Sequence, residues 1–280
     1  MSAGEAVIDL DGLVDLHVHS APDVRPRYAD DLQVAREAAA AGMRAILLKS
    51  HHTLTADRAA IAESTVTGLR VFGGLALNGP VGGLNPAAVE VALRLGARCI
   101  WMPTLDALNH RRYRGEPGGI SVLGSGGRIR PVVLEILDLV REHDVVLATG
   151  HLSPGESMAL VRAARRRRLN RIVVTHPDTA FVAMPVTMQG ELASMGAVLE
   201  RCYVDTTAKP GAISMGLLAA RIREVGFAST ILTTDLGQAH NPPPVVGFRE
   251  FLGRLAGEGI PVPDLRRMAG ARPAALMGLH

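Results

Sequence analysis

The sequence contains few cysteines and few lysines, and each shortage excludes a class of protein. Only two cysteines occur among the 280 residues, Cys99 and Cys202, and both lie in apolar segments. Two such thiols provide no disulfide framework, so we expect buried free thiols in a reducing compartment. Lysine occurs only at positions 49 and 209, so arginine carries most of the basic charge, and the formal net charge is +3. This charge is too small and too dispersed to indicate a nucleic-acid-binding protein.

Long apolar runs are also missing from the sequence. No uninterrupted stretch approaches the roughly 20 apolar residues that a membrane-spanning helix needs. Residues 1–12 lack the basic stretch and apolar core of a secretion signal. We therefore expect a cytoplasmic protein that binds neither a membrane nor a nucleic acid. Hydrophobic residues make up 48% of the sequence and charged residues 20%, which suits a large buried core and argues against disorder.

Eight short runs of aliphatic and β-branched residues predict the strands of a parallel sheet. Segments with helical periodicity lie between most of these runs, and several end in a glycine that suits a helix C-terminus, as at Gly42, Gly96 and Gly226. The runs are almost continuously apolar, as strands are when helices cover a parallel sheet. They begin near positions 13, 44, 70, 98, 145, 171, 202 and 229.

This alternation predicts an α/β protein, a (β/α)8 TIM barrel that forms a single domain over residues 1–280. An open, doubly wound sheet is the alternative, but no glycine-rich fingerprint follows the first predicted strand. One interval is longer than the others. Residues 103–130 join the fourth predicted strand to the fifth and are rich in glycine and arginine. We expect a long loop or lid over the mouth of the barrel there.

Histidines gather at the predicted C-terminal ends of the strands, where a barrel of this kind holds its active site. The first run ends in His-Val-His, and alternate side chains of a strand point to the same side. Neutral imidazole is the commonest protein ligand for zinc and related ions, so the pair indicates a metal site. Asp205 lies in the seventh predicted strand, and Asp235 ends the eighth. Six of the ten histidines follow this pattern: His17, His19, His51, His52, His151 and His176.

The ordered pattern resembles the amidohydrolase superfamily of metal-dependent barrel hydrolases. The resemblance implies that His17 and His19 bind one divalent metal ion. It further implies that His151 and His176 bind a second ion, or that one of them binds a single ion while the other contacts substrate. Asp235 would bind the metal or its water and act as proton shuttle. The C-terminal segment MAGARPAALMGL is also similar to the closing helix of that superfamily.

The sequence departs from the superfamily in one respect. Members with two metals usually supply a carboxylated lysine or a glutamate from the fourth strand, and the run RCIWMPTLDA has neither at the expected place. Lys49 lies instead at the end of the second predicted strand. It could be carboxylated and bridge two metals, or stay cationic and hold an anionic group of the substrate. Asp106 could also substitute, so we expect one or two ions, with zinc favoured and manganese, iron or cobalt compatible.

Three further polar residues are weaker candidates for binding substrate. His52 follows Lys49 and could orient the site, or it could cap the next helix. Asp178 follows His176 through Pro177 and could orient a ligand or close a turn. Asp106 is the third candidate, from the loop after the fourth predicted strand.

These residues predict an enzyme, a metal-dependent hydrolase acting on a small-molecule amide, lactone or ester. A bound divalent ion lowers the pKa of its water from ~16 to about 7 and polarises the group under attack. Asp235 would take the proton of that water and pass it to the leaving group. Barrels of this kind often associate, so a homo-oligomer is compatible with this interpretation. No loop carries a motif that identifies the substrate.

Two alternative functions are also compatible with the sequence. The opening DLHVHS also resembles the PHP phosphoesterases, but those enzymes typically have an Asp-x-His pair near the end, and Gly237 follows Asp235 at that spacing. The second alternative is a barrel that catalyses decarboxylation or isomerisation, or that binds a ligand without turnover.

Overall fold

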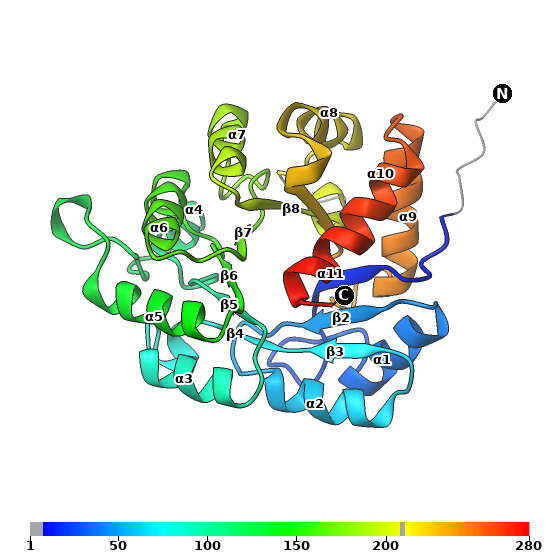
Figure 1. Cartoon of the computed structure of the whole chain (residues 1–280), viewed down its shortest axis with the longest axis horizontal. Helices are drawn as coiled ribbons and strands as arrows, with labels where there is room; N and C mark the ends of the chain where they lie inside the picture. The colour runs from blue at the N-terminus through cyan, green and yellow to red at the C-terminus, as the bar shows by residue number, and fades with distance from the viewer. Residues whose placement is uncertain (1–7, 208–210, 280) are drawn as a thin grey trace.

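The computed structural model describes residues 8–207 and 211–279 (Figure 1). Strands and helices alternate along the chain, and every pair of neighbouring strands is parallel. The helices lie outside the strands and cover them. The strands are β1 (Val14–Val18), β2 (Ala45–Leu48), β3 (Arg70–Phe72), β4 (Gly74–Ala76), β5 (Cys99–Trp101), β6 (Val146–Ala148), β7 (Ile172–Val174), β8 (Val198–Cys202) and β9 (Thr230–Thr233).

The strands β3 and β4 are two halves of one barrel strand that is interrupted at Gly73. They belong to separate hydrogen-bonded sheets, one with the order β1-β2-β3 and the other running from β4 to β9. A Cβ atom at Gly73 would collide with the backbone of Thr55. The hydroxyl of Thr55 also accepts a hydrogen bond from the backbone N–H of Gly74 at 2.9 Å. Because the backbone of Thr55 approaches so closely, residue 73 must be a glycine, and the strand pairing is interrupted there.

Backbone hydrogen bonds between the last and first strands close the barrel. The N–H of Asp235 donates to the carbonyl of His17 at 2.8 Å, and the N–H of His19 donates to the carbonyl of Leu236 at 2.7 Å. With β3 and β4 counted as one, eight parallel strands therefore form the ring. The predicted (β/α)8 barrel is confirmed.

The helices begin and end close to the residues that the sequence predicts. Gly42, Gly96 and Gly226 follow α1, α3 and α8 with positive φ angles of 74°, 89° and 100°, as expected for glycine after a helix C-terminus. Helix α6 begins with a capping box formed by Ser153 and Glu156. The helices are α1 (Asp31–Ala40), α2 (Ala56–Thr65), α3 (Pro86–Arg94), α4 (Leu108–Tyr113), α5 (Pro131–Glu142), α6 (Pro154–Arg166), α7 (Val186–Ser194), α8 (Met215–Val225), α9 (Pro244–Gly257), α10 (Val262–Arg266) and α11 (Arg272–Met277).

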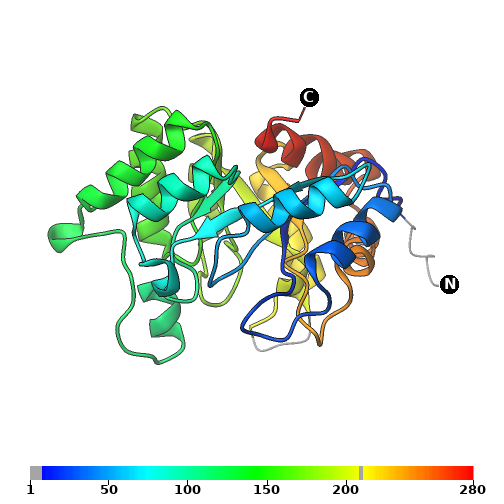
Figure 2. The ribbon, with the colours of Figure 1, turned by 90° about the horizontal axis from the view of Figure 1, so that it is seen from below.

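The two ends of the barrel differ in what covers them. Figure 2 shows α11 at the opposite side of the molecule from the loops that follow β1 and β9. The apolar side chains of α11, Leu276 and Met277, pack with Val14 and Leu47 in the barrel interior. The C-terminal helix therefore covers the end where the strands begin, and the end where they finish is left to the loops.

Two sequence predictions about secondary structure need correction or refinement. The sequence predicts that the seventh strand begins near residue 202, but β8 ends at Cys202, and residues 203–206 form a 3-10 turn. The strand start is mispredicted because Glu200 and Arg201 interrupt the apolar pattern of the strand.

The segment 103–130 contains helix α4 and a short 3-10 turn (Ser125–Gly127). Within the described ranges, no helix is long and apolar enough to cross a membrane.

Candidate metal centre

An irregularity in β1 directs the two histidines of His-Val-His into the barrel. Val14 and Leu16 pack in the interior cluster, whereas Val18 packs in the cluster beneath the surrounding helices. The register with β2 shifts between Asp15 and Val18. A bulge of this kind re-aims the side chains that follow it. As a result, His17 points to the same side of the strand as Leu16.

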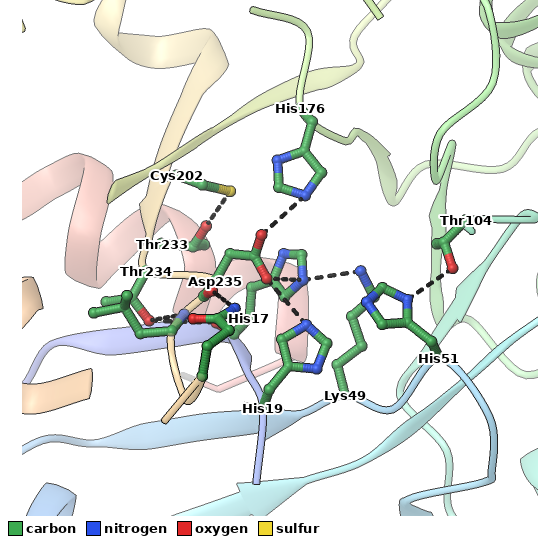
Figure 3. A network of polar contacts seen from close by, with 12 residues as sticks. His17, His19, Lys49, His51, Thr104, His176, Cys202, Thr233, Thr234 and Asp235 are labelled. Carbon is green, nitrogen blue, oxygen red and sulfur yellow. Dashed lines mark hydrogen bonds and ion pairs between the residues drawn. The ribbon is translucent and has the colours of Figure 1, made fainter. Parts of the chain in front are cut away.

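The carboxylate of Asp235 is the point at which three histidines converge (Figure 3). Its Oδ1 lies 3.1 Å from Nε2 of His17 and 3.0 Å from Nε2 of His19. Its Oδ2 lies 3.3 Å from Nε2 of His176. These four residues come from the ends of β1, β7 and β9, so the barrel brings together residues that are far apart in the sequence.

Two of these residues have backbone conformations that L-residues rarely adopt. The φ angle is 50° at His176 and 51° at Asp235, which places both in the left-handed region. Such conformations are costly for residues other than glycine and concentrate at functional sites. Each residue lies two positions after the end of its strand, so the sharp turn directs each side chain toward the centre of the mouth.

Buried carboxylates support the histidines from the side opposite to Asp235. Nδ1 of His17 lies 3.0 Å from Oε1 of Glu200, and Nδ1 of His176 lies 3.2 Å from Oδ2 of Asp205. The hydroxyl of Thr233 also donates to Glu200 at 3.2 Å. A carboxylate in this position accepts a hydrogen bond from the Nδ1–H of the imidazole, which directs Nε2 toward the centre, where it could bind a cation.

Charge interactions at the centre shift the pKa values in opposite directions. Burial opposes ionisation of Asp235, but His17, His19 and His176 outweigh it, so the pKa of Asp235 lies well below its usual value. Burial also opposes the charged form of His17, yet Asp235 and Glu200 raise its pKa to about 9. For His19 burial dominates and lowers the pKa to about 3. Asp235 is therefore ionised at neutral pH, and His19 is neutral.

Lys49 lies at the centre of the site, as its position after β2 predicts. Its Nζ is 2.9 Å from Nε2 of His17 and 5.3 Å from the centre of the Trp101 ring. The side chain is completely buried, and burial lowers its pKa. Nε2 of His17 thus lies within hydrogen-bond distance of both the Lys49 amine and the Asp235 carboxylate.

His151 and His51 form the other wall of the site. Nδ1 of His151 lies 3.1 Å from Nδ1 of His110, and Nδ1 of His51 lies 2.9 Å from the hydroxyl of Thr104. Burial lowers the pKa of His51 and of His151 well below the usual value, and that of His110 to about 4. These imidazoles are therefore neutral at pH 7.

The convergent residues open into a cavity of about 610 Å³ at the C-terminal mouth of the barrel. Its wall combines the histidines of the centre with arginines from the loop after β1 and with one aromatic ring, Phe181. The residues that line it are His19, Arg25, Pro26, Arg27, His51, His151, His176, Phe181, Asp205, Asp235, Gln238, Ala239 and His240.

The three candidate substrate-binding residues lie outside this cavity. His52 and Asp106 line a neighbouring cavity of about 270 Å³, which shares Arg25 and His51 with the larger one. Asp106 accepts a hydrogen bond from the backbone of Gly79 at 2.8 Å. Asp178 is buried, and its carboxylate pairs with Arg201 and Arg221. Asp178 therefore anchors the turn after β7 and does not line either cavity.

Two residues that contact the centre are not predicted by the sequence pattern. Glu200 lies within β8, where the charged pair Glu200–Arg201 hid the strand. His110 lies on α4, in the segment that was expected to be a loop or lid. The signal for Glu200 is an acidic residue at an interior position of a strand. His110 gives no such signal, because it is a lone histidine in a glycine-rich segment.

The donor atoms fit a divalent metal ion. Nε2 of His17, Nε2 of His19 and a carboxylate oxygen of Asp235 all lie within 4.8 Å of one another. Imidazole nitrogen and carboxylate oxygen are the ligand types of catalytic zinc sites. The donor atoms of a second group, His17, His176 and Cys202, also lie within 4.8 Å of one another. Burial raises the pKa of the Cys202 thiol well above its usual value, so the group containing Asp235 is the better site for a cation.

Residues 12–200 match a protein family described as "Family of unknown function (DUF6282)". No curated protein matches the sequence.

Solved structures resemble the chain over nearly its whole length. An amidohydrolase from Pseudomonas aeruginosa is 12% identical with a TM-score of 0.66, and the match covers 95% of each chain. A putative 2-pyrone-4,6-dicarboxylic acid hydrolase from Pseudomonas putida is 16% identical with a TM-score of 0.63, covering 98% of this chain and 99% of that one. A 2,6-dihydroxybenzoate decarboxylase from Rhizobium is 14% identical with a TM-score of 0.59, covering 96% and 99%. These similarities confirm the fold that the resemblance to the amidohydrolase superfamily implied.

Proposed function

The chain belongs to the DUF6282 family, whose function is unknown, and we propose that it is a metal-dependent hydrolase of a small-molecule amide, lactone or ester. One observation carries the proposal: His17, His19 and His176 converge on the ionised carboxylate of Asp235 at the mouth of the barrel. The mouth is where enzymes with this fold place their active sites.

The residues present would hold one divalent ion between β1 and β9. His17, His19 and Asp235 would be its ligands, and His176 and His151 lie on the side where a second ion or the substrate would bind. Such an ion supplies a hydroxide at neutral pH and polarises the carbonyl group under attack. Zinc is the metal that this set of imidazole and carboxylate donors favours.

Asp235 would act as the proton carrier of the reaction. It is ionised at neutral pH, and its side chain is 14% exposed, so water in the cavity reaches it. Oδ1 faces His17 and His19, whereas Oδ2 faces His176. Asp235 would accept a proton from the attacking water and deliver it to the leaving group.

Lys49 would complete the centre in one of two forms. A neutral lysine amine reacts with carbon dioxide, and burial favours the neutral amine here by lowering its pKa. The carboxylated side chain would provide an oxygen ligand beside His17. An uncarboxylated, charged Lys49 would instead hold an anionic group of the substrate. A structure of the metal-loaded protein distinguishes the two forms.

The geometry argues against the phosphoesterase alternative. The second residue of an Asp-x-His pair would fall at Gly237, and this glycine has a φ angle of 120°. A Cβ atom there would collide with the carbonyl of His19. A histidine at this position would therefore disrupt the closure of the barrel between β9 and β1.

Metal analysis paired with a substrate panel tests the proposed function. The purified protein, loaded with zinc or manganese, is expected to retain at least one ion per chain after dialysis. It is expected to hydrolyse members of a panel of p-nitrophenyl esters, amides and lactones and to leave p-nitrophenyl phosphate unchanged. Retention of no ion, together with no hydrolysis in the presence of added metal, would overturn the proposal. Release of carbon dioxide from aromatic acids, without ester hydrolysis, would assign a decarboxylase instead.

A further inference from the structure

We infer that the substrate carries a carboxylate remote from the bond that is cleaved, and that Arg25 binds this carboxylate. The inference rests on the proposed function, because it names the substrate class of the same cavity. It follows from the distribution of charge along the loop after β1.

This loop, residues 19–30, carries two arginines that reach the cavity, and one of them is already neutralised. Arg27 donates from Nε and from Nη2 to the same oxygen of Asp23, at 3.0 and 2.8 Å. The other oxygen of Asp23 lies 3.3 Å from Nδ1 of His52. Arg27 and Asp23 therefore form a closed pair with little charge left for a ligand.

Arg25 is the arginine that remains available. Its backbone N–H donates to Asp23 at 3.2 Å, but its guanidinium forms no hydrogen bond or ion pair with any residue that the structure describes. The residue is exposed and lines both the 610 Å³ cavity and the smaller cavity beside it. Arg25 thus borders the space in which substrate would bind.

The loop that carries Arg25 is fixed in place. The N–H of Tyr28 donates to the carbonyl of Gly237 at 2.8 Å, and the N–H of Ala21 donates to the carbonyl of Ala29 at 2.8 Å. Arg27 also forms a β-bridge with Gln238. Figure 2 shows this loop beside the loop that follows β9. The loop that carries Arg25 is therefore tied to the segment that directly follows Asp235.

The acidic residues of the large cavity have other partners. Asp235 faces three histidines, and Asp205 pairs with His176. In the smaller cavity, Asp106 and Glu116 pair with Arg111 and Arg114. The acidic residues of both cavities therefore have partners other than Arg25. A guanidinium binds a carboxylate through two parallel hydrogen bonds. One guanidinium matches the single charge of a carboxylate, whereas a phosphate monoester carries nearly two charges at pH 7.

A matched pair of esters tests the inference. The probes are mono-p-nitrophenyl glutarate, which has a terminal carboxylate, and p-nitrophenyl butyrate, which has a neutral chain. In both reactions water adds across the acyl–oxygen bond and p-nitrophenol leaves. After subtraction of the uncatalysed rates, the zinc-loaded enzyme is expected to prefer the glutarate ester in kcat/KM. Arg25→Gln is expected to reduce this preference about 10- to 100-fold, as expected for a lost hydrogen bond to a charged group.

Arg94→Gln is the matched control. Arg94 is exposed at the end of α3 and pairs only weakly, at 3.9 Å, with Glu90. This variant removes the same charge far from the mouth and is expected to keep the preference of the wild type. An equal loss of preference in both variants would show a general charge effect and would overturn the inference. An unchanged preference in Arg25→Gln would overturn it as well.

A binding measurement separates failure of this inference from failure of the proposed function. Glutarate is expected to raise the melting temperature of the zinc-loaded wild type and of Arg94→Gln more than that of Arg25→Gln. Neutral glutaramide is expected to raise the melting temperature of none of the three proteins. If no ester is hydrolysed but this pattern appears, the hydrolase proposal fails and the carboxylate site stands. If glutarate shifts all three proteins equally, or inorganic phosphate alone depends on Arg25, the carboxylate site is wrong.

Discussion

Nδ1 of His17 lies 3.0 Å from Oε1 of Glu200, and both side chains are buried inside the barrel. Glu200 accepts a hydrogen bond from Nδ1–H, and this hydrogen bond sets the imidazole so that Nε2 faces Asp235 and Lys49. The pKa of Glu200 is lowered because His17 outweighs the effect of burial, so the glutamate is ionised. The glutamate thus orients His17 without reaching the cavity.

Glu200→Gln is therefore expected to weaken metal binding about 10- to 100-fold, as loss of a carboxylate behind a histidine ligand commonly does. The change keeps the size of the side chain but removes the charge that orients His17. Competition with a chelating dye measures the dissociation constant for zinc. Glu90→Gln, on an exposed face of α3, is the control and is expected to bind zinc like the wild type. Equal affinity in Glu200→Gln would contradict the role assigned to this residue.

Asp235→Asn is expected to lower kcat by at least about 100-fold, because the amide cannot accept and return a proton. His17 and His19 remain as ligands, so most of the bound metal is expected to stay at saturating concentrations. Steady-state kinetics and elemental analysis of the same preparation measure the two effects. Asp138→Asn, at a half-buried position of α5 far from the cavity lining, is the control. An unchanged rate in Asp235→Asn with saturating metal would refute the proton-carrier role.

His110→Phe is expected to lower kcat about tenfold with a smaller change in KM. Phenylalanine keeps the ring packing against Phe181, at 4.9 Å between centroids, but removes the nitrogen that lies 3.1 Å from Nδ1 of His151. His151 then loses the partner that sets its orientation. The melting temperature should change by only a few degrees. His143→Phe, at the exposed end of α5, is the matched control, and equal kinetics for both variants would show that His110 only fills space.

Arg201→Met is expected to destabilise the fold by about 3–5 kcal/mol, because it leaves the buried carboxylate of Asp178 without its main partner. Arg201 is completely buried and pairs with Asp178, which also accepts from Arg221 at 2.6 Å. Urea denaturation measures the free energy of unfolding. Arg162→Met is the control, since Arg162 pairs with Glu191 at the surface, and the expected loss there is under about 1 kcal/mol. Similar losses in both variants would contradict this account.

Much of the fold could be predicted from the sequence, because its signals are local. Seven of the eight predicted strand starts agree with the structure, since apolar runs and helix-ending glycines act over a few residues. The exception is β8, where the buried side chains include Glu200 and Arg201. Burial of charged residues depends on partners from β1 and from the turn after β7, which local pattern cannot reveal.

The chemical nature of the centre was likewise contained in the sequence, because histidines at strand ends of a barrel must meet at one mouth. Which atoms meet was decided only by the tertiary structure. The bulge in β1 turns His17 inward, the left-handed backbone at His176 and Asp235 aims both side chains at the centre, and the register between β9 and β1 brings Asp235 to 3.0 Å from His19. These features depend on pairing between distant strands, whereas periodicity reports only the preference of each segment by itself.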